Sequence, residues 1–322
     1  MTRSTLTPFT DIDLDLPGRT TGKVRVMYSL PGQRRLLVTT DRLSAFDKVV
    51  AAVPFKGQVL NQLSWWWFET TRDLVDNHAL AQPDPNALVA TEATVLPVEV
   101  VVRRRITGVT STSLWRQYAE GARVIYGHEF PDGLRKNEVL PEAIITPTTK
   151  AAHGAHDEPL TCADVTQKGL VEPMLWDRVQ AVALALFTRG EAVAERAGLV
   201  LADTKYEFGL DATGRLLLID EVHTPDSSRW WVADGLDARL AAGQEPESLD
   251  KEPVRRALAD SGYGGDGPPP ELGAEVWEET TRRYVDAYQR ITGLRFEPGK
   301  YPVEQRLSAN LEAWLGQERT SE

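Results

Sequence analysis

The amino-acid sequence predicts an α+β protein, because two β-hairpins and several separate helices can be recognised in it. The first hairpin covers residues 22–41, where two β-rich runs flank a turn at Pro31 and Gly32. The second covers residues 199–222, where the turn sequence DATG joins two apolar runs. Antiparallel hairpins combined with separate helices are typical of the α+β class.

The segments between the hairpins are predicted to contain a helix, further strands and a long loop region. A helical run covers residues 58–75, and a strand-rich run covers residues 88–106. Residues 121–159 read as irregular, with many Pro, Gly, Asp and His residues. A long loop inside a compact domain is often functional, so this region is a candidate for part of a site.

Two long helices are predicted in the second half of the chain. The first carries an apolar face and ends at Gly198, a plausible C-terminal stop. Its apolar residues are Val179, Val182, Ala183, Leu186 and Phe187. The last helix follows a stiff proline-rich linker over residues 265–273 and ends at Gly293. One side of this helix carries Trp277, Tyr284, Tyr288 and Ile291.

Composition limits the classes of function. The 322 residues suffice for one large domain or two joined ones, and 42% of them are hydrophobic, as in ordinary globular proteins. The formal net charge of -11 argues against a nucleic-acid-binding surface, which requires a basic footprint. Cys162 is the single cysteine, so no intramolecular disulfide can form. Neither a signal segment nor a membrane-spanning run is recognised, and we expect a cytoplasmic protein.

The second hairpin carries a candidate metal site. Strand alternation places Asp203, Lys205 and Glu207 on one face. If residues 211–214 form the whole turn, Lys205 lies opposite Asp220, and Glu207 and Asp220 become diagonal neighbours roughly 7–8 Å apart. Two carboxylates at this separation suit Mg²⁺, which also takes water and phosphate oxygens as ligands. A solvated hairpin face with one cross-strand ion pair is the alternative.

Three further segments are candidates for binding anions. The sequence TPDSSR after the hairpin offers serine hydroxyls and Arg229 as a phosphate cradle, although Asp and Ser also favour a helix N-cap. Gly22, Lys23 and Arg25 could close over nucleotide phosphates, as the glycine-rich loop of kinases does, or form a solvated basic strand. The run of arginines at residues 103–105 suggests an anion, or pairing with surface acids.

Two other patterns are weaker. His153 and His156 have metal-like spacing, but a merely polar loop accounts for them equally well. The three tryptophans at residues 65–67 are more typical of core and interface packing than of a base-stacking platform.

Several longer motifs occur in order from about Gly22 to Trp231. They are GKVR, TTDRLSAFD, KGQVLNQLSWWWFE, LPVEVVVR, TSTSLW, EFPDGLRKNEVLPEAIITPTTKAAHGAHDE, LADTKYEFGLD and LIDEVHTPDSSRWW. With these motifs the chain resembles the phosphoribosylaminoimidazole-succinocarboxamide synthase (SAICAR synthetase) family. Together they are far more specific than any single motif.

The resemblance implies a two-lobed fold with a kinase-like or ATP-grasp-like nucleotide cleft. Residues 1–97 would form a β-rich lobe that covers ATP, and residues 98–322 an α+β lobe with the metal and substrate site. It also implies small-molecule substrates and the cofactors ATP and Mg²⁺. ATP would phosphorylate the carboxylate of carboxyaminoimidazole ribonucleotide, and L-aspartate would then displace phosphate to give an amide. Neither a nucleic acid nor a membrane is implied, and the oligomeric state is not indicated.

The resemblance also assigns roles to residues of this sequence. ATP would be bound by Gly22, Lys23, Arg25, Lys205 and, in the hinge at residues 96–99, by Glu99. Mg²⁺ would be held by Glu207 and Asp220. Catalytic roles would fall to Lys150, Lys205 and Asp226. The substrate would be bound by Asp41, Ser44, Arg103, Thr110, Ser228 and Arg229, with Asp47 in the same loop as Asp41.

Two positions depart from the family pattern. Many members have Asp after GKVR, where this chain has Val26, and little follows from this difference. The second departure is sharper. After the arginine that matches Arg103, the family usually continues to a Gly-Ser pair whose serine binds the substrate phosphate, whereas this chain has Gly108 and Val109. Valine has no side-chain donor, so Thr110, Arg104 or Arg105 is expected to compensate. The alternative is a paralogue that uses the same chemistry on a related heterocyclic carboxylate in nucleoside natural-product biosynthesis.

Overall fold

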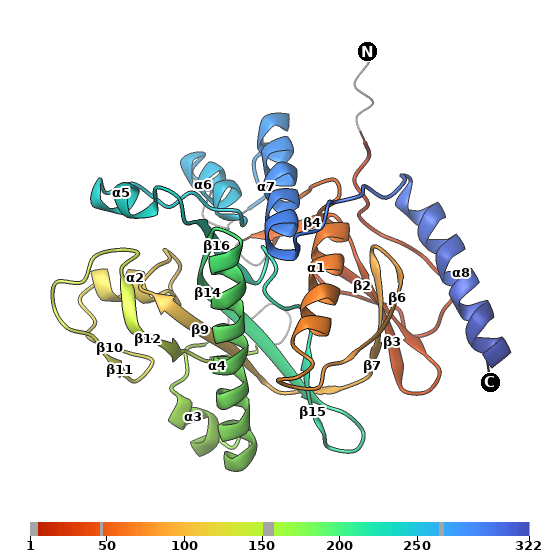
Figure 1. The fold of residues 1–322 in the computed structure, drawn as a ribbon, viewed down its shortest axis with the longest axis horizontal. Coiled ribbons are helices and arrows are strands. Elements are labelled where there is room, and N and C mark those ends of the chain that lie inside the picture. The colour runs from red at the N-terminus through yellow and green to blue at the C-terminus, as the bar shows by residue number, and fades with distance from the viewer. Residues whose placement is uncertain (1–5, 46–47, 151–157, 264–266, 322) are drawn as a thin grey trace.

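The computed structural model describes residues 6–45, 48–150, 158–263 and 267–321 (Figure 1). Its helices are α1 (Lys56–Thr70), α2 (Leu114–Ala119), α3 (Cys162–Gln167), α4 (Pro173–Arg196), α5 (Leu236–Ala241), α6 (Glu252–Asp260), α7 (Ala274–Thr292) and α8 (Val303–Ser321). Its strands are β1 (Thr20–Thr21), β2 (Arg25–Leu30), β3 (Arg34–Thr39), β4 (Arg42–Ala45), β5 (Lys48–Ala52), β6 (Ala79–Asp84), β7 (Ala87–Thr91), β8 (Thr94–Val95), β9 (Val98–Arg105), β10 (Val124–Ile125), β11 (His128–Glu129), β12 (Val139–Ile145), β13 (Thr148–Thr149), β14 (Leu199–Leu210), β15 (Leu216–Ile219) and β16 (Ser228–Val232). The predicted α+β class is confirmed.

The first hairpin is part of an antiparallel sheet with the strand order β1-β2-β3-β7-β6. Strands β2 and β3 pair from Arg25 opposite Thr39 to Leu30 opposite Arg34, as the turn at Pro31 and Gly32 predicts. Gly32 has a φ of 74°, which a residue without a Cβ atom adopts at little cost.

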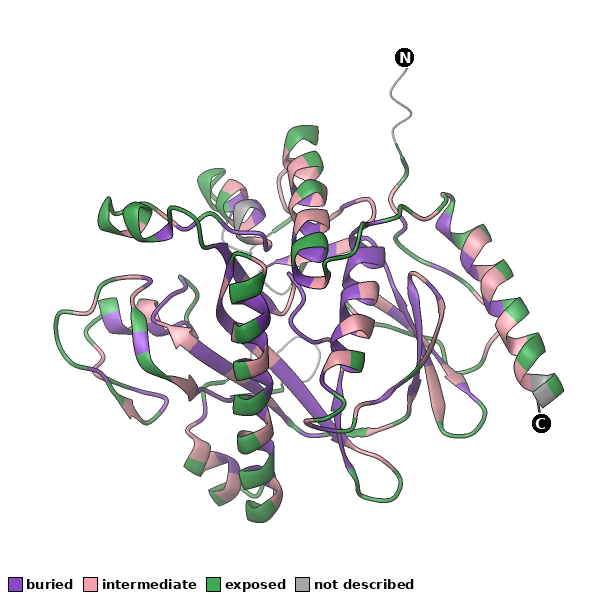
Figure 2. Cartoon of the chain, in the orientation of Figure 1, coloured by how far each residue is buried: buried purple, intermediate pink, exposed green. Residues whose placement is uncertain are grey.

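The second hairpin is part of a larger sheet that contains β12, β9, β14 and β15 in this order. Strand β13 also pairs with β9, and strands β8 and β16 also pair with β14. The central strands β9 and β14 are antiparallel, with Asp203 opposite Arg103 and Lys205 opposite Val101. In Figure 2 both strands are largely buried, whereas the outer faces of the helices are exposed.

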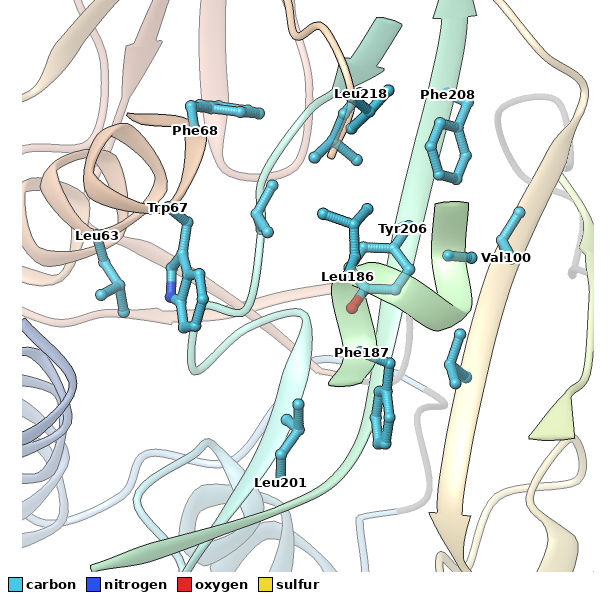
Figure 3. Packing of buried hydrophobic residues seen from close by; sticks show 14 of the residues in the cluster. Leu63, Trp67, Phe68, Val100, Leu186, Phe187, Leu201, Tyr206, Phe208 and Leu218 are labelled. Atoms are coloured by element: carbon cyan, nitrogen blue, oxygen red, sulfur yellow. The ribbon is translucent and has the colours of Figure 1, made fainter. Parts of the chain in front are cut away.

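The main core lies between the larger sheet and helices α1 and α4. Figure 3 shows Trp67 of α1, Phe187 of α4 and Tyr206 of β14 among the side chains that fill it. The predicted apolar face of α4 is confirmed, since Val179, Ala183, Leu186 and Phe187 are buried and Val182 packs against them. The helix is followed by Gly198 at a φ of 65°, also as predicted.

The last two helices attach to different parts of the molecule. Helix α7 buries Tyr284, Tyr288 and Ile291 and ends at Gly293, which confirms the predicted face. Helix α8, which the sequence analysis did not predict, packs on the first sheet through Leu307 and Leu311. The division of the chain at residues 97 and 98 stays a prediction.

The region predicted as irregular contains more strand than expected. Strand β12 pairs with β9, although the pairing register shifts between Val139 and Ile144. This bulge explains why a regular alternation is not visible in the sequence. His153 and His156 lie outside the described residues. In the described part of the chain, no helix has both the length and the apolar character that crossing a membrane requires.

The close approach of α1 to the first sheet gives a testable prediction. A Cβ atom at Gly57 would lie 2.4 Å from the carbonyl oxygen of Thr39 and 2.8 Å from the carbonyl carbon of Thr40. We expect Gly57→Ala to lower the free energy of unfolding by about 1–3 kcal/mol, because α1 must shift away from this backbone. Urea denaturation measures the change.

The matched control is Gly316→Ala in α8. A Cβ atom at Gly316 meets no heavy atom within 4 Å. Alanine should therefore stabilise this helix by roughly 0.5–1 kcal/mol. Equal effects of the two substitutions would show that the contact with Thr39 does not limit the packing of α1.

Candidate functional site

The register of the second hairpin differs by one residue from the prediction. Leu210 lies opposite Leu216 and Glu207 opposite Ile219, so the expectation that Lys205 faces Asp220 is wrong. The cause is a longer turn, in which the backbone N–H of Asp211 donates to the carbonyl of Arg215 at 3.0 Å. The Asp211 carboxylate also accepts the backbone N–H of Arg215 at 3.0 Å, and this holds the extra residue in place.

Asp220 reaches the predicted site by another route. It follows β15 with a φ of 68°, so the regular strand ends here. Its carboxylate accepts a hydrogen bond from the Arg25 guanidinium, and its carbonyl accepts a second one at 3.3 Å. Arg25 begins β2, and Asp220 directly follows β15. This ion pair therefore joins the first sheet to the larger one at the predicted ATP site.

A charged cluster occupies the neighbouring face of β9 and β14. The Lys205 ammonium lies 2.7 Å from Glu99 Oε1 and 2.8 Å from Glu207 Oε1. The second carboxylate oxygen of Glu207 forms an ion pair with Lys150. We call Arg25, Lys150, Lys205, Glu99, Glu207 and Asp220 the charged cluster. The structure thus brings together six residues to which the family resemblance assigned roles in ATP binding, metal binding and catalysis.

The charges in this cluster stabilise one another. Burial alone raises the pKa of Glu207, but Lys205 and Lys150 outweigh it and lower the pKa to about 2. Burial lowers the pKa of Lys205, but the carboxylates of Glu207, Glu99 and Asp220 outweigh it and raise the pKa well above its ordinary value. These residues are therefore ionised at neutral pH.

The chemistry and surroundings of the carboxylates of Glu207 and Asp220 are compatible with binding Mg²⁺. Among the described residues, no group of three or more His, Cys, Asp or Glu side chains could hold a metal ion. Mg²⁺ is commonly bound by one or two carboxylates together with water and substrate phosphates, so Glu207 and Asp220 are a sufficient protein contribution. Each of them is now paired with a cation, which a divalent ion would have to replace.

A second group of charges lies farther along the same face. The Arg103 side chain is buried, and its Nη1 lies 3.1 Å from Asp203 Oδ2. Arg229 forms an ion pair with the same carboxylate oxygen. Beside them, the Ser228 hydroxyl lies 2.7 Å from the hydroxyl of Thr204. Two guanidiniums that share one carboxylate leave an excess positive charge, which suits the predicted phosphate of the substrate.

The loop beside these arginines explains the role of Gly108. It has a φ of 94°, and a Cβ atom there would lie 2.5 Å from Ser113 Oγ and 3.1 Å from Arg229 Nη2. Val109 next to it is 51% exposed. The Thr110 hydroxyl lies 2.7 Å from that of Ser113, so it remains beside the predicted phosphate site.

Arg104 and Arg105 were also expected to compensate for Val109, but both have other partners. Arg104 lies 3.5 Å from Glu191 of α4. Arg105 donates to the carbonyl of Asn137 at 3.1 Å and stacks over the Trp231 ring at 5.6 Å.

Asp226 belongs to a buried group that the sequence only partly revealed. Its carboxylate lies 2.8 Å from the ammonium of Lys56, which is fully buried, and accepts the Tyr284 hydroxyl at 2.6 Å. Burial raises the pKa of Asp226, but Lys56 and Lys251 outweigh it and the pKa is lowered. Lys56 and Lys251 were not predicted as site residues, since a single lysine before a helix ordinarily reads as solvated.

Glu221 follows Asp220 directly and was not assigned a role from the sequence. It lies 3.9 Å from Arg25 Nη2 and accepts the Thr224 hydroxyl at 2.7 Å. Burial raises its pKa, and the neighbouring Asp220 adds to this effect. The adjacent acids that end β15 therefore point to the same guanidinium.

The remaining predicted residues lie in the first sheet and the adjoining loops. The backbone N–H of Gly22 donates to the Arg25 carbonyl at 2.9 Å, which forms the turn that carries the exposed Lys23.

Asp41 is fully buried, and its carboxylate accepts N–H groups from Phe9 and Gly57 and the Tyr301 hydroxyl. These are structural contacts, and its role in substrate binding stays a prediction. Ser44 lies on β4, and Asp47 lies outside the described residues.

Comparison with known proteins places this arrangement in a family. A family model described as SAICAR synthetase matches residues 19–270. The phosphoribosylaminoimidazole-succinocarboxamide synthase of Legionella pneumophila (strain Lens) is 47% identical over 313 residues, which are 95% of this chain and 98% of the relative. A putative phosphoribosylaminoimidazole-succinocarboxamide synthase 2 of Agrobacterium fabrum is 45% identical over 304 residues, which are 94% of this chain and 96% of the relative.

The fold supports the same assignment. A solved structure of SAICAR synthase from Saccharomyces cerevisiae, complexed with SAICAR, superposes with a TM-score of 0.76 at 31% sequence identity. The match covers 90% of this chain and 99% of the yeast chain. The chain belongs to the SAICAR synthetase family.

Proposed function

We propose that this protein is an ATP-dependent carbon–nitrogen ligase that joins L-aspartate to the carboxylate of carboxyaminoimidazole ribonucleotide. The products are SAICAR, ADP and phosphate, and the reaction belongs to purine biosynthesis. Membership of the family supports this function, as do the names of its relatives. The single structural observation behind it is the charged cluster, in which Arg25 of the first sheet meets the carboxylates of the larger sheet.

The chemistry requires an activated carboxylate. A carboxylate is a poor acyl donor because oxide would have to leave, whereas an acyl phosphate releases phosphate readily. Lys150 and Lys205 carry positive charge to where the transferred phosphoryl group would lie, and Arg25 adds a third cation. Fixed charges of this kind stabilise charge that develops in the transition state. Mg²⁺, held by Glu207 and Asp220, would neutralise phosphate oxygens.

We assign the other residues around this centre. Glu99 in the hinge at residues 96–99, with Gly22 and Lys23, would bind ATP between lobes formed by residues 1–97 and 98–322. Arg103, Arg229, Ser228 and Thr110 would bind the ribotide, with Asp41 and Ser44 beyond them. Asp226 would lie next to the reacting groups. We place the reaction in the cytoplasm.

A product assay tests the function. Purified protein is incubated with ATP, Mg²⁺, the ribotide and a panel of amino acids, and products are identified by mass spectrometry. We expect SAICAR only with L-aspartate, and phosphate release only when both the ribotide and L-aspartate are present. Release without the amine would indicate a kinase instead. The names of the relatives do not support the alternative of a paralogue that acts on another heterocycle. Turnover of the ribotide at no more than a background rate would favour that alternative.

Arg229→Ala tests the substrate end of the site. Removal of this guanidinium should raise the KM for the ribotide by about 10–100-fold, because a charge-assisted hydrogen bond to an anion is lost. The KM for ATP should change by less than about threefold. Initial-rate kinetics with each substrate varied in turn measures both constants. Equal increases for ATP and ribotide would contradict the assignment.

A further inference from the structure

A small hollow lies next to Arg229, and neither Arg103 nor Asp203 is part of its lining. Its lining includes Gly108, Val109 and Arg229 together with Lys136, Glu245 and Arg256. Its volume of about 20 Å³ gives room for a small polar group and not for a base or a ribose. An occupant would therefore be the end of a larger molecule whose remainder lies outside the hollow.

The part of the lining that carries Glu245 belongs to a loop that is fixed to the sheet. The loop that carries Glu245 is held by backbone bonds to β16, from Val232 N–H to the Glu247 carbonyl at 2.8 Å and from Leu249 N–H to the Trp230 carbonyl at 2.8 Å. Lys136 forms an ion pair with the Glu245 carboxylate. These contacts hold Glu245 and Lys136 at a defined position relative to Arg229, which is itself on β16.

The charges around the hollow are unbalanced. Lys136 forms an ion pair with Glu245, and Arg256 acts electrostatically on the same carboxylate. Burial raises the pKa of Glu245, but Lys136, Asn137 and Arg256 outweigh it and lower the pKa, so the carboxylate is ionised.

The lining of the hollow includes three cations, Lys136, Arg229 and Arg256, and one carboxylate, Glu245, which leaves two positive charges in a protein whose formal net charge is -11. A phosphate monoester carries nearly two negative charges at neutral pH and has several acceptor oxygens. Its charge therefore matches the lining of the hollow. L-Aspartate also brings carboxylate groups to the reaction. The experiment therefore has to distinguish the ribotide phosphate from these carboxylates as the group that occupies the hollow.

We propose that Lys136 and Arg256 bind the phosphate of the ribotide together with Arg229 and so contribute to substrate specificity. This inference rests on the proposed function for the identity of the substrate. It also accounts for Val109, whose side chain offers no hydrogen bond to the hollow, while Arg104 and Arg105 have other partners. Lys136 and Arg256 supply cationic donors at the same hollow.

The test compares the ribotide with the corresponding riboside, which lacks the phosphate. Equilibrium binding to Arg256→Ala and Lys136→Ala is measured by calorimetry, and kcat/KM is measured beside it. Each substitution should weaken ribotide binding by about tenfold, because a charged donor is lost, and should leave riboside binding unchanged. Glu245→Gln should instead strengthen ribotide binding, because it removes a negative charge from the lining of the hollow.

The matched control is Arg290→Ala on α7, where the arginine lies 3.0 Å from Asp286 and away from the hollow. It should change neither ligand's affinity. Equal losses for ribotide and riboside, or no loss for either, would overturn the inference. So would an increase in the KM for L-aspartate in place of the ribotide, because the hollow would then belong to the amino acid.

The two proposals can fail separately. Ribotide binding that depends on Arg256 without formation of SAICAR would refute the proposed function and retain the phosphate site. Formation of SAICAR with ribotide affinity that is indifferent to Arg256 and Lys136 would retain the function and refute the site. A wild-type protein that neither binds nor converts the ribotide would refute both.

Discussion

Asp220→Asn is expected to lower kcat by about 100-fold to 1,000-fold, the range seen when one preorganised electrostatic group is removed from an active site. The substitution keeps the size of the side chain and removes one negative charge from the charged cluster. If Asp220 helps to hold Mg²⁺, the concentration of Mg²⁺ needed for half-maximal rate should also rise. Initial rates measured over a series of Mg²⁺ concentrations give both quantities.

The control for this experiment is Asp76→Asn. Asp76 is also an aspartate paired with an arginine, at 3.6 Å from Arg215, but it is exposed and lies outside the charged cluster. Its substitution should leave kcat and the Mg²⁺ dependence unchanged within about twofold. Thermal melts of both variants check that they are folded. A kcat for Asp220→Asn close to that of the wild type, with the same Mg²⁺ dependence, would refute the metal role.

The hairpins show what local sequence can and cannot predict. Both were found from the sequence because turn residues and apolar runs are local signals. The register of the second was wrong by one residue, because the side chain of Asp211 organises a turn one residue longer than DATG. Asp220 still reaches the cluster through its left-handed backbone and its bond to Arg25, and neither follows from strand alternation.

Helix α8 and Lys56 were missed for different reasons. The apolar residues Val303, Leu307 and Leu311 of α8 recur at helical spacing and were an available signal that the sequence analysis did not use. Lys56 had no such signal. Its partner Asp226 is distant in sequence, and only the packing of α1 against the segment after β15 brings the two together. Long-range pairs of this kind are accessible from structure and not from periodicity.

Lys56→Met is expected to have the largest effect on stability. The ammonium of Lys56 is fully buried 2.8 Å from Asp226, and methionine retains most of the side-chain volume while removing the charge. The substitution leaves a buried carboxylate without its closest cation, a change that typically costs about 3–5 kcal/mol. Lys251 also acts on Asp226 and lessens the loss, so we expect the lower end of this range. Urea denaturation at pH 7 measures the free energy of unfolding.

The pH dependence distinguishes a lost ion pair from lost packing. In the wild type the pKa of Asp226 is lowered in the folded state. This group therefore stabilises the fold fully at pH values above its unfolded-state pKa, and the contribution is lost as the pH falls through its folded-state pKa. In Lys56→Met the pKa of Asp226 should rise, because burial then acts with one cation fewer. The stability difference between variant and wild type should therefore shrink as the pH is lowered and Asp226 becomes neutral.

Two further variants distinguish the effect of the Lys56 charge from that of its packing. Lys56→Met combined with Asp226→Asn should recover part of the lost stability, since the carboxylate that lost its closest cation is then replaced by a neutral amide. Lys48→Met replaces an exposed lysine of β5 and should change the free energy of unfolding by less than about 0.5 kcal/mol. A loss for Lys56→Met that is independent of pH, with no recovery in the double variant, would mean that packing of the side chain, and not its charge, holds α1 against the segment that carries Asp226.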